Sequence, residues 1–333
     1  MTELASPVVG WLGMLLLLMP AATLLSKAAF VALRRWRPDA LRNGGGLCYA
    51  LLVAPVLSPL VWFGSAAVHH AEPGMATGAC LRANLAEICL EPIAFLAVVL
   101  VAVAVGALRL APRILPAFAR APEIDDDELS DRLAGLGLPA AIFRRIAVVE
   151  DEAIRTVGLW RPVIELGRQS AQDLDDEALA AAVRHEAAHV QAYDPLRYVV
   201  AMICSALNPL GQLLEPELIR WRAAREQACD REAVHHGASP LALAAAIVIN
   251  ARSSAVTPAP AALSGVAAQV QGRVALLLGY VESPPPCSCS RAGRHLALVA
   301  AAMLLVAPHA ADAWPLLDLH AGLETGRLEL PSP

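Results

Sequence analysis

Charged residues, aromatic residues and an excess of positive charge are all scarce in this sequence. Charged residues make up 17% of the 333 positions, aromatic residues make up 5%, and the net charge is −5. A soluble domain of ordinary composition has about a quarter of its residues charged, so this composition argues against that class. Without a basic excess, direct binding of DNA or RNA is not expected. The seven cysteines form no disulfide framework of the kind found in small secreted proteins.

Apolar residues are abundant instead, and they predict a membrane protein. They account for 57% of the chain, and the mean hydropathy is +0.52. A helix needs about 20 apolar residues to cross a bilayer, and runs close to that length predict transmembrane helices at about 8–33, 47–68, 93–111 and 295–312. The first run is not expected to be a cleaved signal peptide, because the preceding residues contain Glu3 and no lysine or arginine.

Basic residues near the ends of these runs predict the orientation of the chain. Lysine and arginine are retained on the cytoplasmic side, and they gather after the first run, after the third run and before the fourth: Lys27, Arg34, Arg35, Arg37, Arg42, Arg109, Arg113, Arg120, Arg291 and Arg294. We therefore expect a membrane domain at 1–111, a cytoplasmic domain at 112–294, a fourth span at 295–312 and a short extracytoplasmic tail at 313–333.

The cytoplasmic part contains two short β-rich stretches followed by a helical pattern. Ile146–Glu150 and Pro162–Leu166 are predicted to be strands, with Pro162 restricted to a strand start or a sheet edge. A helix is expected from Asp173, a candidate N-cap with acidic residues in the first turn.

That helix carries the motif H-E-A-A-H. His185 and His189 are four residues apart, so both imidazoles lie on one helical face and can reach one metal ion. Zinc held by three protein ligands keeps one position open for water and lowers the pKa of that water towards about 7. Glu186 stands beside the histidines as the candidate general base. The pattern predicts a catalytic zinc site.

A second helix offers the third ligand. Glu226 and Asp230 are four residues apart in R-E-Q-A-C-D. We expect Glu226 to complete the His, His, Glu site, and Asp230 to hold the far nitrogen of a ligating imidazole. His235 and His236 are competing ligands, but they do not share the face of Glu226 and are expected at the surface.

The apolar segment Tyr198–Leu214 lies between these two ligand helices. If it crossed the bilayer once, His189 and Glu226 would lie on opposite sides and could not share a metal ion. The 36 residues between them are too few for two crossings, which need about 40 residues in helices alone. The segment is therefore expected to pack within the domain or to dip into the membrane and return.

These motifs together resemble the membrane zinc metallopeptidases of the BlaR/MecR antirepressor type. The resemblance rests on T-V-G-L-W-R-P-V-I-E-L (156–166), H-E-A-A-H-V-Q-A-Y-D (185–194), N-P-L (208–210) and E-Q-A-C-D (226–230). It implies a mostly α-helical membrane protein with a cytoplasmic α+β, gluzincin-like protease domain between the third and fourth spans, in a bacterial inner membrane. It also implies peptide hydrolysis with one Zn²⁺ per chain and Glu186 as general base. An edge strand for substrate binding would come from Val157, Gly158, Pro162, Val163 and Ile164.

One departure from the antibiotic-sensing members concerns the signal. Those members carry a penicillin-binding domain after the last span, whereas about 20 residues follow it here, so a β-lactam is not expected to be sensed by acylation of a serine. In the outside connection, Cys80 and Cys89 could form a disulfide, could bind a metal with His69 and His70, or could have no special role.

The resemblance implies a signalling protease that cleaves itself or a BlaI/MecI-like cytoplasmic repressor, with the lipid bilayer as its other partner. Candidate self-cleavage sites are 253–262 and 283–290. Two alternatives remain open: an HtpX-like quality-control protease and a non-catalytic, zinc-stabilised membrane transducer. Tyr193, Arg225, His235 and His236 are the candidate side chains for stabilising the oxyanion, and the sequence does not rank them. The sequence also does not define the inducing signal, the cleavage specificity or the oligomeric state.

Overall fold

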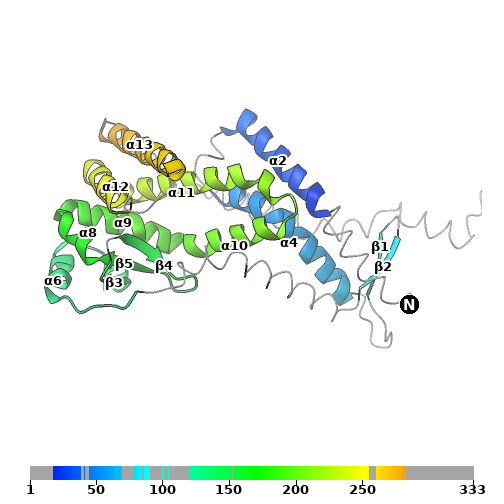
Figure 1. Ribbon diagram of the computed structural model, residues 1–333, viewed down its shortest axis with the longest axis horizontal. Helices are drawn as coiled ribbons and strands as arrows, with labels where there is room; N and C mark the ends of the chain where they lie inside the picture. The colour runs from blue at the N-terminus through cyan, green and yellow to red at the C-terminus, as the bar shows by residue number, and fades with distance from the viewer. Residues whose placement is uncertain are drawn as a thin grey trace, which may run out of the picture.

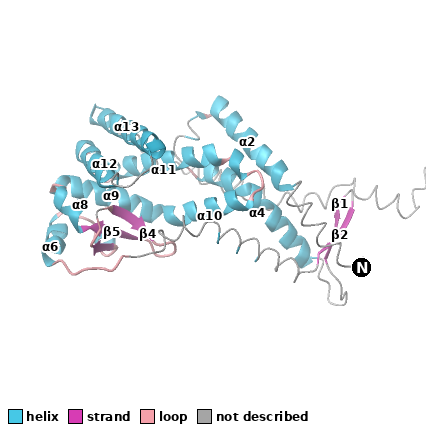
Figure 2. Cartoon of the chain, viewed as in Figure 1, coloured by secondary structure: helices cyan, strands magenta, loops and turns pink. Residues whose placement is uncertain are grey.

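The computed structural model describes residues 18–38, 41, 45–69, 79–83, 86–90, 100, 104, 108, 121–151, 153–254 and 260–282. The described part is mostly helical, with a three-stranded sheet at the end of the molecule opposite the first helix and a separate two-stranded sheet (Figures 1 and 2). The predicted fourth span, the tail and the self-cleavage segment 283–290 lie outside the described residues. Most of the predicted third span lies outside them as well.

The three-stranded sheet contains β3 (Ile146–Val149), β4 (Ile154–Val157) and β5 (Val163–Gly167) in the order β3-β5-β4. β5 pairs with β3 in parallel and with β4 antiparallel. The two predicted strands are present, and Pro162 directly precedes β5, as expected for a strand start. The edge-strand prediction is wrong for Val163 and Ile164, because both sides of β5 are already paired within the sheet. β4, which includes Val157, is the edge strand on one side of β5.

Helices cover this sheet and continue the chain beyond it. They are α6 (Asp127–Gly135), α7 (Ala140–Phe143), α8 (Arg168–Asp173), α9 (Asp176–Ala192), α10 (Asp194–Leu207), α11 (Glu215–His235), α12 (Pro240–Ser254) and α13 (Pro260–Glu282). The predicted helix start at Asp173 is two residues early. Asp173 ends α8, and Asp175 caps α9 by accepting a hydrogen bond from the backbone N–H of Ala178.

A hydrophobic core joins the sheet to α9, α12 and α13. Its fully buried members include Ile164 and Leu166 of β5, Leu179 of α9, Leu243 of α12 and Leu277 of α13. The faces of the sheet and of α9 that carry these residues are removed from water together, which supplies the main driving force for this part of the fold. The rigid packing fixes α9, and with it the H-E-A-A-H motif.

The segment Tyr198–Leu214 forms most of α10, the 3-10 turn η2 (Gly211–Leu213) and their junction. α10 leaves the end of α9, and α11 brings the chain back to pack against α9 (Figure 1). Arg222 and Arg225 of α11 donate hydrogen bonds to Tyr198 and Asp194 of α10. Gly211 is required at the turn, because a Cβ there would lie 2.0 Å from the backbone oxygen of Ser205. The chain therefore returns to α9, as expected if His189 and Glu226 share a metal ion.

Two further helices coincide with parts of the first two predicted spans: α2 (Met19–Trp36) and α4 (Gly46–His69). α4 packs against α10 and α11, and α2 packs against α4 and η2. A second hydrophobic cluster joins these elements and includes Phe30, Val56, Met202 and Trp221. Among the described residues, no helix combines the length and the hydropathy that a membrane crossing requires.

Polar contacts also tie α2 to the ends of α10 and α11. Buried Thr23 exchanges hydrogen bonds with Asn208, with Nδ2 to Oγ1 at 2.8 Å. Glu217, in the first turn of α11, accepts hydrogen bonds from Lys27 at 2.8 Å and from Arg34 at 2.7 Å. The N-P-L motif and the start of α11 therefore both contact α2.

A separate hairpin consists of β1 (Ala79–Ala83) and β2 (Ala86–Leu90). The strands are antiparallel, and the register places Cys80 directly opposite Cys89. His69 is the last residue of α4, and His70 lies outside the described residues. The three roles considered for these cysteines therefore stay predictions.

Candidate metal centre

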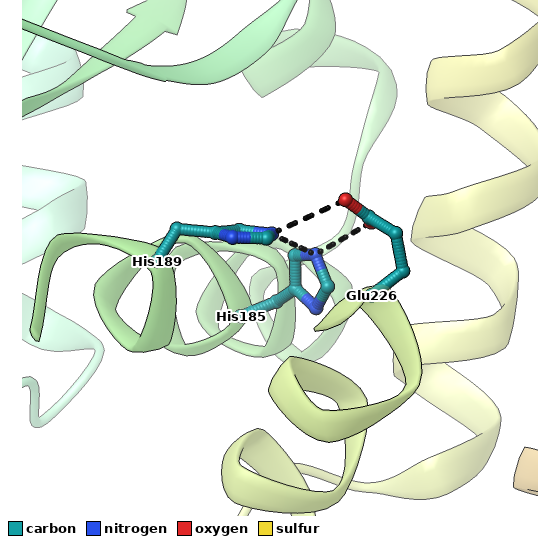
Figure 3. A group of neighbouring side chains, drawn as sticks. All are labelled: His185, His189 and Glu226. Carbon is teal, nitrogen blue, oxygen red and sulfur yellow. Dashed lines mark hydrogen bonds and ion pairs between the residues drawn. The ribbon is translucent and has the colours of Figure 1, made fainter. Parts of the chain in front are cut away.

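The structure brings His185, His189 and Glu226 together (Figure 3). Both histidines project from α9 towards α11, which supplies the glutamate. The two Nε2 atoms lie 3.2 Å apart, and each lies 3.6 Å from one carboxylate oxygen of Glu226. One donor atom of each residue therefore falls within 4.8 Å of the others.

These distances fit a tetrahedral zinc ion. Ligand nitrogens at about 2.0–2.1 Å from zinc lie about 3.3 Å from one another in that geometry, close to the 3.2 and 3.6 Å separations. The donor set of two imidazoles and one carboxylate is one that zinc prefers in catalytic sites. The three side chains are therefore suited to hold zinc with little rearrangement.

Asp194 fixes the orientation of His189. Its Oδ2 lies 2.8 Å from Nδ1 of the ring, so the proton is assigned to Nδ1 and Nε2 keeps its lone pair for a metal ion. The turn between α9 and α10 creates this contact, because Tyr193 ends α9 in the left-handed conformation with φ of +53°. Asp194 is buried and is itself held by Arg225 at 2.8 Å.

Asp230 lies against the other imidazole. Its Oδ1 is 3.0 Å from Nδ1 of His185, and the carboxylate is fully buried. The oxygen lies off the direction of the ring N–H, so the contact is an ion pair rather than an aligned hydrogen bond. When each ring carries its single proton on Nδ1, facing a carboxylate, the two Nε2 lone pairs face one another, an arrangement that a shared cation stabilises.

The electrostatics of the cluster favour positive charge. Burial lowers the pKa of His185, but its contacts with Asp230 and Glu226 outweigh burial and raise that pKa to about 9. The pKa of His189 is also raised, because Cys229 and Asp194 outweigh burial. Burial raises the pKa of Glu226, but His185 and His189 outweigh it and lower that pKa. A site that stabilises an imidazolium stabilises a divalent cation for the same reason.

Glu186 is positioned by the edge strand of the sheet. Its Oε2 accepts a hydrogen bond of 2.7 Å from Oγ1 of Thr156 in β4. Glu186 and His189 line the same cleft of about 350 Å³, together with Glu226 of α11 and Thr156. The predicted general base therefore faces the space beside the predicted metal ligands, where a substrate can enter.

The predicted substrate strand is only partly available. Val157 lies in the edge strand β4, with its side chain buried, and Gly158 follows with φ of +91°, a conformation that glycine adopts freely. Arg155 and Thr156 of β4 line the cleft. The edge that faces the cleft is therefore β4, one strand earlier than Val163 and Ile164.

Four polar residues of the site could not be assigned these roles from the sequence: Thr156, Asp194, Arg273, and Arg225, which holds Asp194. Thr156 and Asp194 lie within the motifs, but the motifs alone predict no role for them, and the sequence offers Arg225 only as a candidate oxyanion donor. Arg273 of α13 was not considered. It pairs with Glu226 at 2.9 Å and with Asp230 at 2.7 Å. His235 and His236, by contrast, are exposed at the end of α11, as expected.

Comparison with known proteins gives one match. The family model described as BlaR1 peptidase M56 matches residues 77–269, which is more than half of the chain. The matched range includes β3 to β5 and the helices α9 to α11 that carry the metal cluster. No curated protein and no solved structure matches.

Proposed function

The chain belongs to the BlaR1 peptidase family M56, and from this membership we propose that it is a zinc-dependent endopeptidase. The observation that carries the proposal is the convergence of His185, His189 and Glu226 within 4.8 Å, beside a cleft lined by Glu186. His185, His189 and Glu226 hold one zinc ion, and Asp194 and Asp230 hold the far sides of the two imidazoles. Zinc bound there supplies a Lewis acid that activates water and polarises the scissile carbonyl.

The chain's own residues carry the proton transfers of peptide hydrolysis. Glu186 accepts a proton from the attacking water, whose oxygen bonds to the carbonyl carbon, and delivers that proton to the nitrogen when the C–N bond breaks. The hydrogen bond from Thr156 holds the carboxylate towards the cleft at 2.7 Å. The free edge of β4 is suited to pair with an extended substrate backbone.

The same chain is proposed to lie in the bacterial inner membrane, with the protease domain at 112–294 facing the cytoplasm. Support comes from the uncharged stretch of α4, from the three further apolar runs and from the clustering of basic residues on one side of them. The attachment of α2 to Asn208 and Glu217 would hold the metal centre close to the membrane surface.

The proposed biological role is signalling by cleavage. The substrate would be the chain itself, or a cytoplasmic transcriptional repressor of the BlaI/MecI type. Family membership supports this role. Comparative proteomics of cells that produce the active protein or Glu186→Gln would identify the substrate as the protein that is cut only by the active form.

Glu186→Gln is the direct test of the chemistry. The variant keeps the metal ligands but loses the proton acceptor, so we expect one zinc per chain and loss of proteolysis. Glu177→Gln is the matched control, because Glu177 is an exposed residue in the first turn of the same helix and should leave proteolysis unchanged. Full activity of Glu186→Gln would overturn the mechanism.

A further inference from the structure

Arg273 lies on the inward face of α13, among residues that pack on the core. Val270, Val274 and Leu277 of the same helix contact the hydrophobic core, and the side chain of Arg273 is only 13% exposed. A buried guanidinium is costly unless charged partners compensate it. The partners of Arg273 therefore define what the residue does.

All three guanidinium nitrogens have carboxylate partners on α11. Nε and Nη2 donate to the two oxygens of Asp230 at 2.8 and 2.7 Å, and Nη1 lies 2.9 Å from Oε2 of Glu226. Asp230 and Glu226 are one helical turn apart, where two carboxylates repel one another. The planar fork of the arginine spans both, which a point charge cannot do.

The contacts reach the metal cluster at three places, and one of them is direct: Nη2 of Arg273 lies 3.4 Å from Nε2 of His185. Oδ1 of Asp230 is shared between Nη2 of Arg273 and Nδ1 of His185, at 2.7 and 3.0 Å. Oε2 of Glu226 lies 2.9 Å from Nη1 of Arg273, and Oε1 of the same carboxylate lies 3.6 Å from Nε2 of His189. Arg273 thus sets the orientation of the Glu226 carboxylate and the position of Asp230 beside His185.

We propose that Arg273 is a positioning residue for the metal centre: by clamping Asp230 and Glu226 together, it orients Glu226 towards the two histidines. The inference rests on the proposed zinc site, and it assigns to α13 a part in that site. Because the geometry of the fork matters as well as its charge, lysine should not replace arginine here.

The test measures zinc affinity and stability separately, in the full-length protein in detergent. Zinc dissociation constants are obtained by competition with a chromophoric chelator, and the thermal midpoint is measured on the zinc-free protein. Outer partners of metal ligands typically contribute 10- to 100-fold to affinity. We expect Arg273→Lys to weaken zinc binding by about tenfold or more and to keep the midpoint close to that of the wild type. Arg273→Gln should lose affinity and also lower the midpoint, because it leaves Asp230 without a countercharge.

Arg132→Lys is the matched control, since Arg132 is a partly buried arginine that binds Asp176 at 2.6 Å, away from the metal cluster. It should leave zinc affinity unchanged. If Arg273→Lys binds zinc as tightly as the wild type and the control, Arg273 is only a countercharge and the inference is overturned. If the wild type itself binds no zinc, the proposed function fails, and the inference fails with it. Should Arg273→Gln not fold, Arg273→Lys alone decides.

Discussion

The contact between Glu217 and α2 can be tested by removing one charge. Glu217→Gln keeps the size of the side chain but removes the negative charge that pairs with three cations: Lys27 at 2.8 Å, Arg34 at 2.7 Å and Arg220 at 3.1 Å. The side chain of Glu217 is 2% exposed. This is the contact that joins the first described helix to the helix of Glu226, so its loss should loosen that junction.

The magnitude follows from the burial of each partner. Breaking a buried ion pair costs about 3–5 kcal/mol, but Lys27 and Arg34 are 32% and 36% exposed and can regain water. Solvent screening of such partly exposed charges reduces the cost, and we expect a loss of about 2 kcal/mol in the free energy of unfolding. The measurement is denaturant unfolding of the full chain in detergent, followed by helical circular dichroism.

Glu215→Gln is the matched control for this experiment. Glu215 is exposed and lies in the same first turn of α11, so both variants lose a similar favourable interaction with the helix dipole. The difference between the two variants isolates the contacts with α2. A difference below about 0.5 kcal/mol, the usual size for a surface substitution, would refute the reasoning.

The same pair of variants also predicts a pH dependence. Burial raises the pKa of Glu217, but hydrogen bonds from Lys27 and Arg34 outweigh it and lower that pKa below its usual value of 4.5. A carboxyl with a lowered folded-state pKa contributes stability above its unfolded pKa and loses it as the pH falls through the folded value. The gap between wild type and Glu217→Gln should therefore be full at neutral pH and should shrink below about pH 4.5.

Three further predictions concern the catalytic base, the histidines and the hairpin. Thr156→Val should reduce proteolysis by about tenfold with zinc content unchanged, because Glu186 loses its hydrogen-bond donor. Thr156→Ser keeps the hydroxyl and should restore activity. Equal activity of both variants would contradict the role of Thr156 in holding Glu186. The pKa of His185 is raised to about 9, so the zinc-free protein should lose stability as the pH rises from about 6.5 to 9. Zinc affinity should increase over the same range, because protons leave the ligands. Measuring the free energy of unfolding and the zinc affinity against pH checks that the two change in opposite directions. Cys80 and Cys89 are predicted to form a disulfide and should resist alkylation until it is reduced. Two residues separate the strands, so this pair is expected at a non-hydrogen-bonded position, with Cα atoms about 4.5 Å apart, a separation that a disulfide can span.

The clustering of His185, His189 and Glu226 could be predicted from the sequence because the spacing of these residues obeys local geometry. Two histidines four residues apart must share a helical face, and so must Glu226 and Asp230. The argument that a shared metal ion forbids a single crossing by Tyr198–Leu214 was also sufficient to predict the return of α10 and α11. Family membership and the two strands at β3 and β5 were predicted correctly.

What could not be predicted depends on tertiary packing. The strand order β3-β5-β4 is a matter of which strands pair in the folded chain, and no local pattern in the sequence favours β4 over β5 as the edge. Asp194 reaches His189 only through the left-handed turn at Tyr193, a residue type that rarely adopts it. Arg273 is 47 residues beyond Glu226, and its one local signal is a charge among Val270, Val274 and Leu277 on the apolar face of α13.

The central claim is that α9 and α11 together bind one zinc ion. Metal analysis of the purified, full-length protein beside His189→Ala and Glu226→Ala tests it most directly. The account predicts one zinc per chain in the wild type and loss of zinc in both variants. A wild type without bound zinc, or variants that retain it in full, would contradict the account.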